Sequence, residues 1–245
     1  MKLIFTICFI LLIISCNTKT KPAVIRRTEF VDTSGLPEDS LAFYFPIKVF
    51  SDGNSIDSFE QNWFSSALYS FKEPILSQGF IGHSIYRFLW LRSFHRPVVF
   101  TLHKNNADIW LNTKMLDKQP SFYDERFGGI SKEEQPEYIK DGYSVDKKRP
   151  DILVRKADRN ANIIYNKNIS LSEKAWGQFE ILLAEAHFWK LPSEITDDSN
   201  DGAQWIIEAH LKNNYHVVNY HSPDGDYKEL GVFLIKLSGL QERIY

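Results

Sequence analysis

The stretch VVFTLHKNNADIWLN, residues 98–112, contains two alternating runs of apolar and polar residues separated by a pair of asparagines. This alternation is typical of half-buried β-strands, because successive side chains point to opposite faces of a sheet. Asparagine tolerates the positive φ that a two-residue turn requires. The pattern predicts a hairpin that turns at Asn105-Asn106 and pairs Leu102 with Ile109. Its apolar face is formed by Val98, Phe100, Leu102, Ala107, Ile109 and Leu111.

A second stretch, QWIIEAHLKNNYHVVNYHS at residues 204–222, repeats this design around Asn213-Asn214. With that turn, Ala209 pairs with Val218 and Leu211 pairs with His216. The opposite, more polar face carries Glu208, His210, Lys212, Tyr215, Val217 and Asn219. Both hairpins have Lys-Asn-Asn at the turn, and each follows an amphipathic helix. A diverged internal duplication is therefore one interpretation.

Three segments have apolar residues at helical spacing. The first starts at Asp57 with Glu60 and stops at Pro74, and the second starts with a capping-box pattern at Ser170 and Glu173. The third follows Ser222-Pro223 and ends at Gly239. Their apolar stripes are Phe59, Trp63, Phe64, Ala67, Leu68 and Phe71 in the first, Trp176, Phe179, Leu183 and Ala186 in the second, and Leu230, Phe233, Leu234 and Leu237 in the third.

These patterns predict an α+β fold, in which an antiparallel sheet from two hairpin-containing halves is covered by about three amphipathic helices. Residues 84–94 add an aromatic strand, and residues 41–50 an extended edge segment because Pro46 cannot donate a ladder hydrogen bond. We expect one domain over 41–245. Its halves, 41–117 and 150–240, are joined by the charged segment 118–149, which is either a linker or a functional loop.

The composition is that of a globular protein, with 43% hydrophobic and 24% charged residues and a formal net charge of −2. Lysines and arginines are scattered along the chain. Binding to a nucleic-acid backbone requires a concentrated basic surface, so the sequence predicts no nucleic-acid partner.

The N-terminus predicts export. Lys2 precedes the apolar run Leu3–Ile14, which is shorter than the ~20 residues of a spanning helix and therefore indicates a signal peptide over residues 1–15. The run ends in Ile13-Ile14-Ser15-Cys16, which resembles a lipobox whose cysteine receives diacylglycerol. Residues 16–40 then form a flexible tether, and Asn17 favours the outer membrane over the inner one. The expected protein is lipid-anchored in the cell envelope.

The common catalytic motifs are missing, and the sequence predicts no cofactor. The sequence partly matches one metal-binding motif. Asp197, Ser199 and Asp201, with Glu208 at the twelfth position, have the oxygen-ligand spacing of a calcium loop. In a calcium loop the last ligand starts a helix, whereas residues around Glu208 form a strand pattern. An acidic turn that enters a strand is the alternative interpretation.

Other polar residues allow structural and functional interpretations. His103 and Asp108 have the composition of a base and its orienting acid, although a salt-linked rung of the sheet explains them equally. Arg87 and Arg92 lie among aromatic residues, where arginine clamps a carboxylate or a sugar, or stacks and pairs structurally. His216 is predicted on the apolar face, where a hydrogen-bonded histidine at the core edge is expected.

Several blocks carry a resemblance to a known family. They are Tyr86-Arg87-Phe88-x-Trp90-Leu91-Arg92-Ser93-Phe94, Asp201-Gly202-Ala203-x-Trp205-Ile206-x-Glu208, Tyr215-His216-Val217-Val218 and Ser222-Pro223. In this order they resemble an uncharacterised family of bacterial exported proteins and lipoproteins, over about residues 85–240. The resemblance implies that Arg92, Trp205, Glu208, Tyr215 and His216 belong to one shared architecture, and it implies no activity. The charged segment after Asp117 departs from the family pattern.

Two hypotheses follow. In the first, the protein is a non-catalytic binding module at the membrane, with an envelope protein, a glycan or a small ligand as its partner, and Arg92, Trp205, Glu208, Tyr215 and His216 are its candidate binding residues. In the second, it is an envelope hydrolase that uses Glu208 with a nearby histidine, with or without a metal. A closed pocket that brings Glu208, His216 and Arg92 together would favour the hydrolase.

Overall fold

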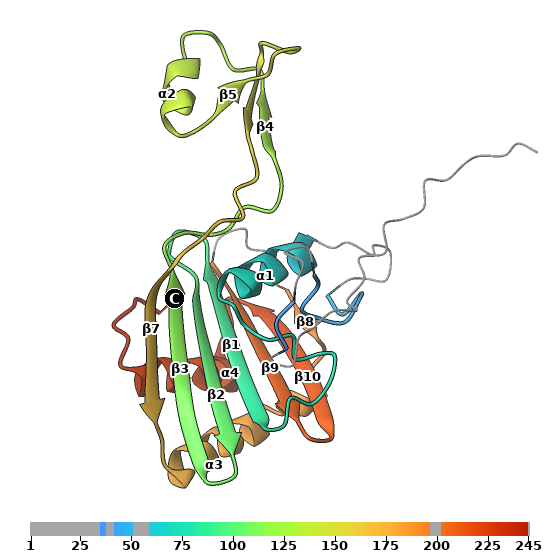
Figure 1. Cartoon of the computed structure of the whole chain (residues 1–245), viewed down its shortest axis with the longest axis vertical. Coiled ribbons are helices and arrows are strands. Elements are labelled where there is room, and N and C mark those ends of the chain that lie inside the picture. Colours follow the sequence, from blue (N-terminus) through green and yellow to red (C-terminus); the bar gives the residue numbers. More distant parts are fainter. Residues whose placement is uncertain (1–34, 38–41, 51–58, 197–201, 245) are drawn as a thin grey trace, which may run out of the picture.

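The structure, a computed structural model, describes residues 35–37, 42–50, 59–196 and 202–244. The α+β class is confirmed: a seven-stranded sheet has the order β7-β3-β2-β1-β9-β10-β8, and a three-stranded sheet has the order β4-β6-β5 (Figure 1). The large sheet consists of β1 Ser84–Arg92, β2 Val98–Asn105, β3 Asp108–Leu116, β7 Ile163–Ser170, β8 Glu194–Ile195, β9 Ala203–Leu211 and β10 Asn214–His221. Adjacent strands of this sheet are antiparallel except β10 and β8, which are parallel to each other. The sheet is therefore mixed, whereas a purely antiparallel one was predicted.

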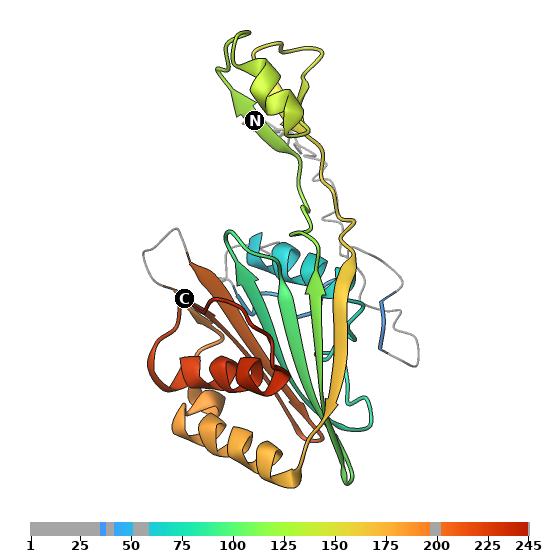
Figure 2. The same ribbon diagram turned by 90° about the vertical axis from the view of Figure 1, so that its left-hand side faces the viewer.

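Helices cover the two faces of the large sheet unequally. The helices α3 (Glu173–Glu185) and α4 (Gly225–Ser238) pack on one face, and α1 (Phe59–Ser70) lies across the upper part of the other (Figures 1 and 2). A short 3-10 helix, η1 (Phe188–Lys190), follows α3. Two apolar cores result, one beneath α3 and α4 and one beneath α1. Each large apolar side chain buried there stabilises the fold by ~1.5–3 kcal/mol.

The first hairpin has the predicted faces and a shifted turn. Asn105 pairs with Asp108 and Leu102 with Leu111, so the turn residues are Asn106 and Ala107, one position beyond the predicted pair. Asn106 has the positive φ, 55°. Moving the turn by one residue moves each partner by two positions, and two positions preserve the face of a strand. The predicted apolar face is therefore retained, apart from exposed Ala107.

The second hairpin is shifted the other way. Leu211 pairs with Asn214 and Ala209 with His216, so the turn lies at Lys212-Asn213 rather than at Asn213-Asn214. The faces again agree with the prediction, because the partners move by two positions.

The residues of the three predicted helical stripes are buried or half-buried except for Phe59, which is 50% exposed, and one helix start differs from the prediction. Phe64, Ala67, Leu68 and Phe71 are buried beside α1, and Trp176, Phe179 and Leu183 are buried on α3. The N-cap of α3 is Ser172, whose hydroxyl accepts a hydrogen bond from the Ala175 amide, whereas Ser170 ends β7. The helix α4 ends as predicted at Gly239, whose φ is 73°. The predicted start at Asp57 lies outside the described residues.

The predicted edge strand over residues 41–50 is wrong in its described part. Residues 42–50 form bends and turns, with Lys48 at φ 67° and the Val49 amide bonded to the Pro46 carbonyl at 3.2 Å. The aromatic residues of this segment are buried beneath α1, where Phe45 and Phe50 contact Phe64 edge-on. An apolar run therefore fills a core here without joining a sheet.

The two predicted halves share one sheet. The strand β7 of the second half pairs with β3, and β9 pairs with β1. The charged segment 118–149 belongs to a small lobe with β4 Glu125–Gly128, α2 Gln135–Lys140, β5 Ser144–Val145 and β6 Ile152–Arg155, which projects from the body on two extended segments (Figure 2). At its base, the Asp117 amide donates to the Asn162 carbonyl at 2.9 Å. The lobe is thus an insertion between β3 and β7.

The N-terminal predictions lie largely outside the described residues. Residues 1–34 and 38–41 are not described, which includes the signal peptide and Cys16. Of the predicted tether, residues 35–37 contact the body: the Gly35 carbonyl accepts a hydrogen bond from the Ile75 amide at 2.9 Å. Within the described ranges, no helix has both the length and the apolar character needed to cross a bilayer.

Candidate functional site

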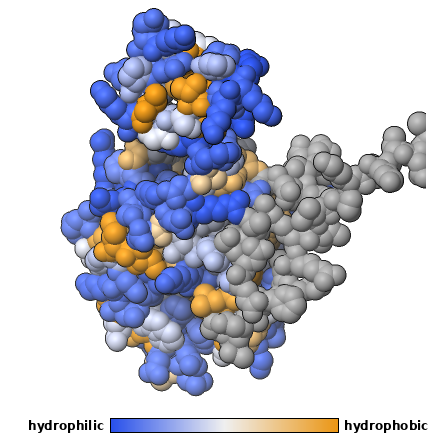
Figure 3. Space-filling model, turned by 45° about the horizontal axis from the view of Figure 1, so that its top comes forward, coloured by the Kyte–Doolittle hydropathy of each residue, from blue (hydrophilic) through white to orange (hydrophobic). Residues whose placement is uncertain are grey.

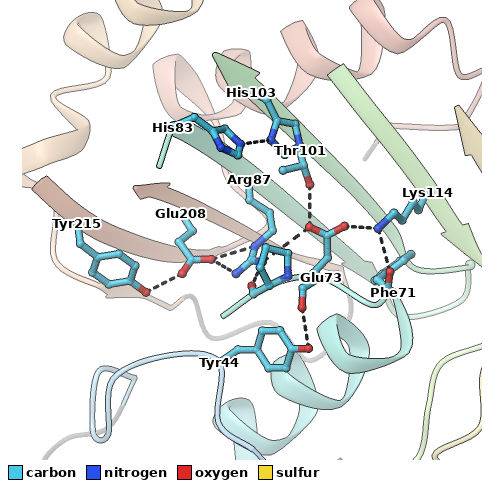
Figure 4. Close-up of polar contacts among 11 residues, drawn as sticks. Tyr44, Phe71, Glu73, His83, Arg87, Thr101, His103, Lys114, Glu208 and Tyr215 are labelled. Carbon is cyan, nitrogen blue, oxygen red and sulfur yellow. Dashed lines mark hydrogen bonds and ion pairs between the residues drawn. The ribbon is translucent and has the colours of Figure 1, made fainter. Parts of the chain in front are cut away.

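A cluster of charged side chains is buried between the large sheet and the segment that follows α1 (Figure 4). Arg87 of β1, Glu208 of β9 and Glu73 after α1 are each at most 2% exposed as residues, and Lys114 of β3 lies at the margin. Arg87 and Glu208 come together because they are direct cross-strand partners. Burial of isolated charges costs several kcal/mol each, so such groups require partners.

Glu208 has partners at both carboxylate oxygens. Arg87 donates from Nε to Oε2 at 3.0 Å and also from Nη2 to the same oxygen. The Tyr215 hydroxyl donates to Oε1 at 2.7 Å. Burial raises the pKa of Tyr215 well above its ordinary value, and the neighbouring carboxylate of Glu208 raises it further. Burial also raises the pKa of Glu208, while the neighbouring charge of Arg87 opposes that shift. The neutral Tyr215 hydroxyl is therefore the donor in this hydrogen bond.

Glu73 forms the other half of the cluster. Its carboxylate accepts hydrogen bonds from Lys114 Nζ at 2.7 Å and from Thr101 Oγ1 at 3.1 Å, and Arg87 Nη1 lies 3.8 Å from Oε2. The Tyr44 hydroxyl donates to the Glu73 carbonyl at 2.9 Å. Two carboxylates thus face two cations, and the formal charges of the cluster balance.

A pair of histidines adjoins this cluster on the same face. His83 Nε2 lies 3.0 Å from His103 Nδ1, and the ring of His103 stacks on Trp110 at a centroid distance of 4.6 Å and an interplanar angle of 7°. Burial lowers the pKa of His103 to about 4, and the cations Lys114 and Arg87 lower it too, while Glu73 opposes them. His103 is therefore neutral at pH 7.

The structure brings together two of the five candidate binding residues, Glu208 and Tyr215. Arg92 lies at the other end of β1, where its guanidinium sits 4.0 Å from the centroid of the Trp90 ring and pairs with Glu242 at 2.8 Å. Trp205 lies on the opposite face, in the core beneath α4. The five residues therefore do not meet at one place in the structure, because the pleat and the length of β1 separate them.

His216 also lies apart from Glu208. Its ring is at the edge of the α3 side, with Nε2 3.1 Å from the Leu191 carbonyl and the ring 5.1 Å from that of Phe188. The prediction of a hydrogen-bonded histidine at the core edge is confirmed. The pocket of Glu208, His216 and Arg92 that would have favoured a hydrolase is not formed.

Two further predicted pairings have definite outcomes. His103 stands opposite Trp110 and Asp108 stands opposite Asn105, so the predicted His103–Asp108 rung is wrong by the same shift of the turn. Of the calcium-loop residues, Asp197, Ser199 and Asp201 lie outside the described residues, and Glu208 is committed to Arg87 and Tyr215. Within the described ranges, no three His, Cys, Asp or Glu side chains are grouped so that they could hold a metal ion.

Sequence reasoning missed Glu73, Thr101 and Lys114. Thr101 and Lys114 occupy inward-pointing positions among apolar neighbours of β2 and β3, and a polar residue at such a position requires a partner. Glu73 follows the end of α1 and carried no periodic signal. A partner for Lys114 could thus be expected from sequence, but its identity could not.

A second feature is the junction between the body and the small lobe. A hollow of about 250 Å³ is lined by residues that include Phe59, Trp63, Phe122 and Tyr123. On the lobe, Phe127 and Ile139 are also exposed. Figure 3 shows hydrophobic patches on the lobe and separate ones on the body within a largely hydrophilic surface.

The chemistry of the buried cluster is that of a structural tie. Both oxygens of Glu208 accept hydrogen bonds, and its carboxylate is buried with its cationic partner, so it is not poised to take a proton from a substrate.

Comparison of the chain with protein-family models, with curated proteins and with solved structures finds no match.

Proposed function

We propose that the protein is a lipid-anchored cell-envelope protein that acts as a non-catalytic binding module. The anchor rests on the sequence of residues 1–16, a basic start and a short apolar run that end at Cys16. Acyl chains contribute ~0.8 kcal/mol for each buried CH₂, so several chains hold the protein at the membrane. Asn17 supports the outer membrane.

The proposal that the protein is not a catalyst rests on the hydrogen bonds that Glu208 already makes inside the fold. A general acid or base must reach the proton it transfers, and the two oxygens of Glu208 are occupied by Arg87 and Tyr215 inside the fold. The alternative, a hydrolase that uses Glu208 with a histidine, would require these bonds to be exchanged for a substrate. We therefore favour binding of an envelope protein, glycan or small ligand.

Mass spectrometry of protein purified from cell membranes tests the anchor. We expect a chain that starts at Cys16 and carries acyl groups, and a Cys16→Ser variant that moves to the soluble fraction. An intact N-terminal methionine, or an unmodified thiol at residue 16, would contradict the proposal.

Complementation of a deletion strain with Glu208→Gln tests the absence of catalysis. Glutamine retains the shape of the side chain and removes its charge and basicity. Glu208→Gln breaks the buried ion pair with Arg87 from one side, so the double variant Arg87→Met/Glu208→Met, which removes both charges, is tested beside it. The variant that accumulates at the wild-type level should restore the wild-type phenotype, whereas a catalytic role for Glu208 predicts a folded protein that does not. Lys104→Gln, which removes a charge from a surface ion pair with Glu173, is the matched control.

A further inference from the structure

One half of the α1-side face of the large sheet is left uncovered by helices. In Figure 1, no helix lies in front of the lower parts of β2, β3 and β7. The side chains that point outward there belong to His103, Trp110, Asn112, Asn166 and Asn168, which we call the amide–tryptophan face. Asn166 and Asn168 are exposed, Trp110 and His103 are half-buried, and Asn112 between them is 9% exposed.

The ring of Trp110 packs against side chains of the neighbouring strand β2. Trp110 stands opposite His103 on one side and Ser170 of β7 on the other. Its ring is nearly parallel to that of His103, at 7° and 4.6 Å. The imidazole of His103 thus covers one face of the indole, and the ring of His83 lies 5.7 Å from it at 34°. The neighbouring strand on the other side of Trp110 is β7. Aromatic rings present their faces to C–H groups that carry partial positive charge.

Three amides form a fixed shelf beside this ring. Asn112 Nδ2 donates to Asn166 Oδ1 at 2.9 Å and to Asn168 Oδ1 at 2.8 Å. Each amide has one acceptor oxygen and two donor hydrogens. Within the described residues, these bonds leave the Asn112 oxygen and the amino groups of Asn166 and Asn168 for a ligand. The shelf therefore offers both donors and an acceptor.

The face carries little unbalanced charge. The cation next to this face, Lys114, forms an ion pair with Glu73 at 2.7 Å. His103 is hydrogen-bonded to His83 and stacks on the ring of Trp110. The acid on this face, Asp108, lies at the hairpin turn. The three amides carry no charge and offer an ionic ligand no ion pair, whereas they match the hydroxyl groups of an uncharged ligand.

We infer that the amide–tryptophan face binds a neutral carbohydrate, with one sugar ring packed against Trp110 and the sugar hydroxyls hydrogen-bonded to Asn112, Asn166 and Asn168. The inference rests on the proposed function as a binding module and names its ligand class. Sugar rings combine an apolar C–H face with hydroxyls that both donate and accept, which is the combination this surface complements. The strand β7 is the last strand of the sheet order, so a linear glycan can continue past the edge.

Binding of the full-length protein in detergent to a panel of neutral linear oligosaccharides, followed by calorimetry on those that bind, tests the inference. We expect Trp110→Ala and Asn168→Ala each to weaken binding at least about tenfold. Trp189→Ala is the matched control, because Trp189 is 40% exposed and contacts His216 of β10, far from β7 in the sheet order. It should bind like the wild type.

Thermal unfolding of each variant separates lost binding from lost folding, and Asn168→Ala changes an exposed side chain that leaves the core intact. Neutral glycan binding that survives both substitutions would overturn the inference, as would preferential binding of charged glycans. A protein that sediments with isolated envelope material but binds no neutral glycan would overturn the ligand class alone. A protein that binds no envelope component would overturn the proposed function too.

Discussion

Arg87 and Glu208 are 121 positions apart in the chain and are joined by two hydrogen bonds from one guanidinium to one carboxylate oxygen. They stand opposite each other where β1 meets β9. The β1–β9 boundary, which we call the seam, joins the strands β1 to β3, which precede the small lobe in sequence, to the hairpin β9–β10, which follows it. The ion pair thus links an early strand of the folded body, β1, to a late one, β9.

Removal of Arg87 should destabilise the protein strongly. Arg87→Met leaves Glu208 without its cation inside the fold, and breaking a buried ion pair from one side costs about 3–5 kcal/mol. Urea unfolding followed by circular dichroism measures the change in the free energy of unfolding. A loss below about 1 kcal/mol would show that the pair does not hold the seam.

The double variant Arg87→Met/Glu208→Met provides the control. It removes both charges together, so it should be clearly more stable than the sum of the two single losses predicts. If the losses are additive, the two side chains do not interact energetically.

The stability of the protein should fall as the pH falls from about 6.5 to about 4. Burial lowers the pKa of His103 to about 4 in the folded state, so in this window the unfolded state binds more protons than the folded one. His103 faces Glu73, Lys114, Arg87 and His83, and its contribution to the loss is at most about 3 kcal/mol. Unfolding free energies measured across this window should decrease with a smaller slope in His103→Gln.

An NMR titration that places the pKa of His103 at its ordinary value would contradict the explanation.

Two glycines in helices should respond to alanine in opposite directions. Gly231 lies inside α4, where an added methyl group would overlap the Trp205 ring and lie 2.8 Å from Phe88 Cε1. Gly231→Ala should therefore destabilise the protein by ~1–3 kcal/mol, despite the better helix propensity of alanine. At Gly177 in α3 nothing lies within 4 Å of the added methyl, so Gly177→Ala should stabilise by ~0.5–1 kcal/mol. Equal shifts in the two melting temperatures would contradict this packing of α4.

Deletion of the small lobe should leave the body folded. The strands β3 and β7 pair directly, and the Asp117 carboxylate accepts hydrogen bonds from the Asn162 backbone and side-chain amides at 2.9 and 3.0 Å. Replacing residues 118–161 with Asn-Gly should close an ordinary hairpin. Circular dichroism should retain the signature of the body and one cooperative thermal transition. Loss of that transition would mean that the contact of Phe59 with Phe122 is part of the core.

Local patterns predicted the secondary structure well where they were periodic. Both hairpins, the aromatic strand and the stripes of α1, α3 and α4 follow from apolar spacing, because burial on one face requires that spacing. The turns were each displaced by one residue, since two adjacent asparagines do not specify which one takes the positive φ. The run at 42–50 was mistaken for a strand because its aromatic residues pack beneath α1 without regular alternation.

The amino-acid sequence by itself determined which faces are apolar, where the helices end and what address the N-terminus predicts, because these depend on neighbours a few positions apart. Only the tertiary structure decided that β9 lies beside β1, and thus that Arg87 meets Glu208 while Trp205 faces the other way. Pairing between distant strands is set by the packing of the whole sheet, and no local pattern encodes it. The same applies to Trp110, which became a candidate sugar platform only once β7 placed two asparagines beside it.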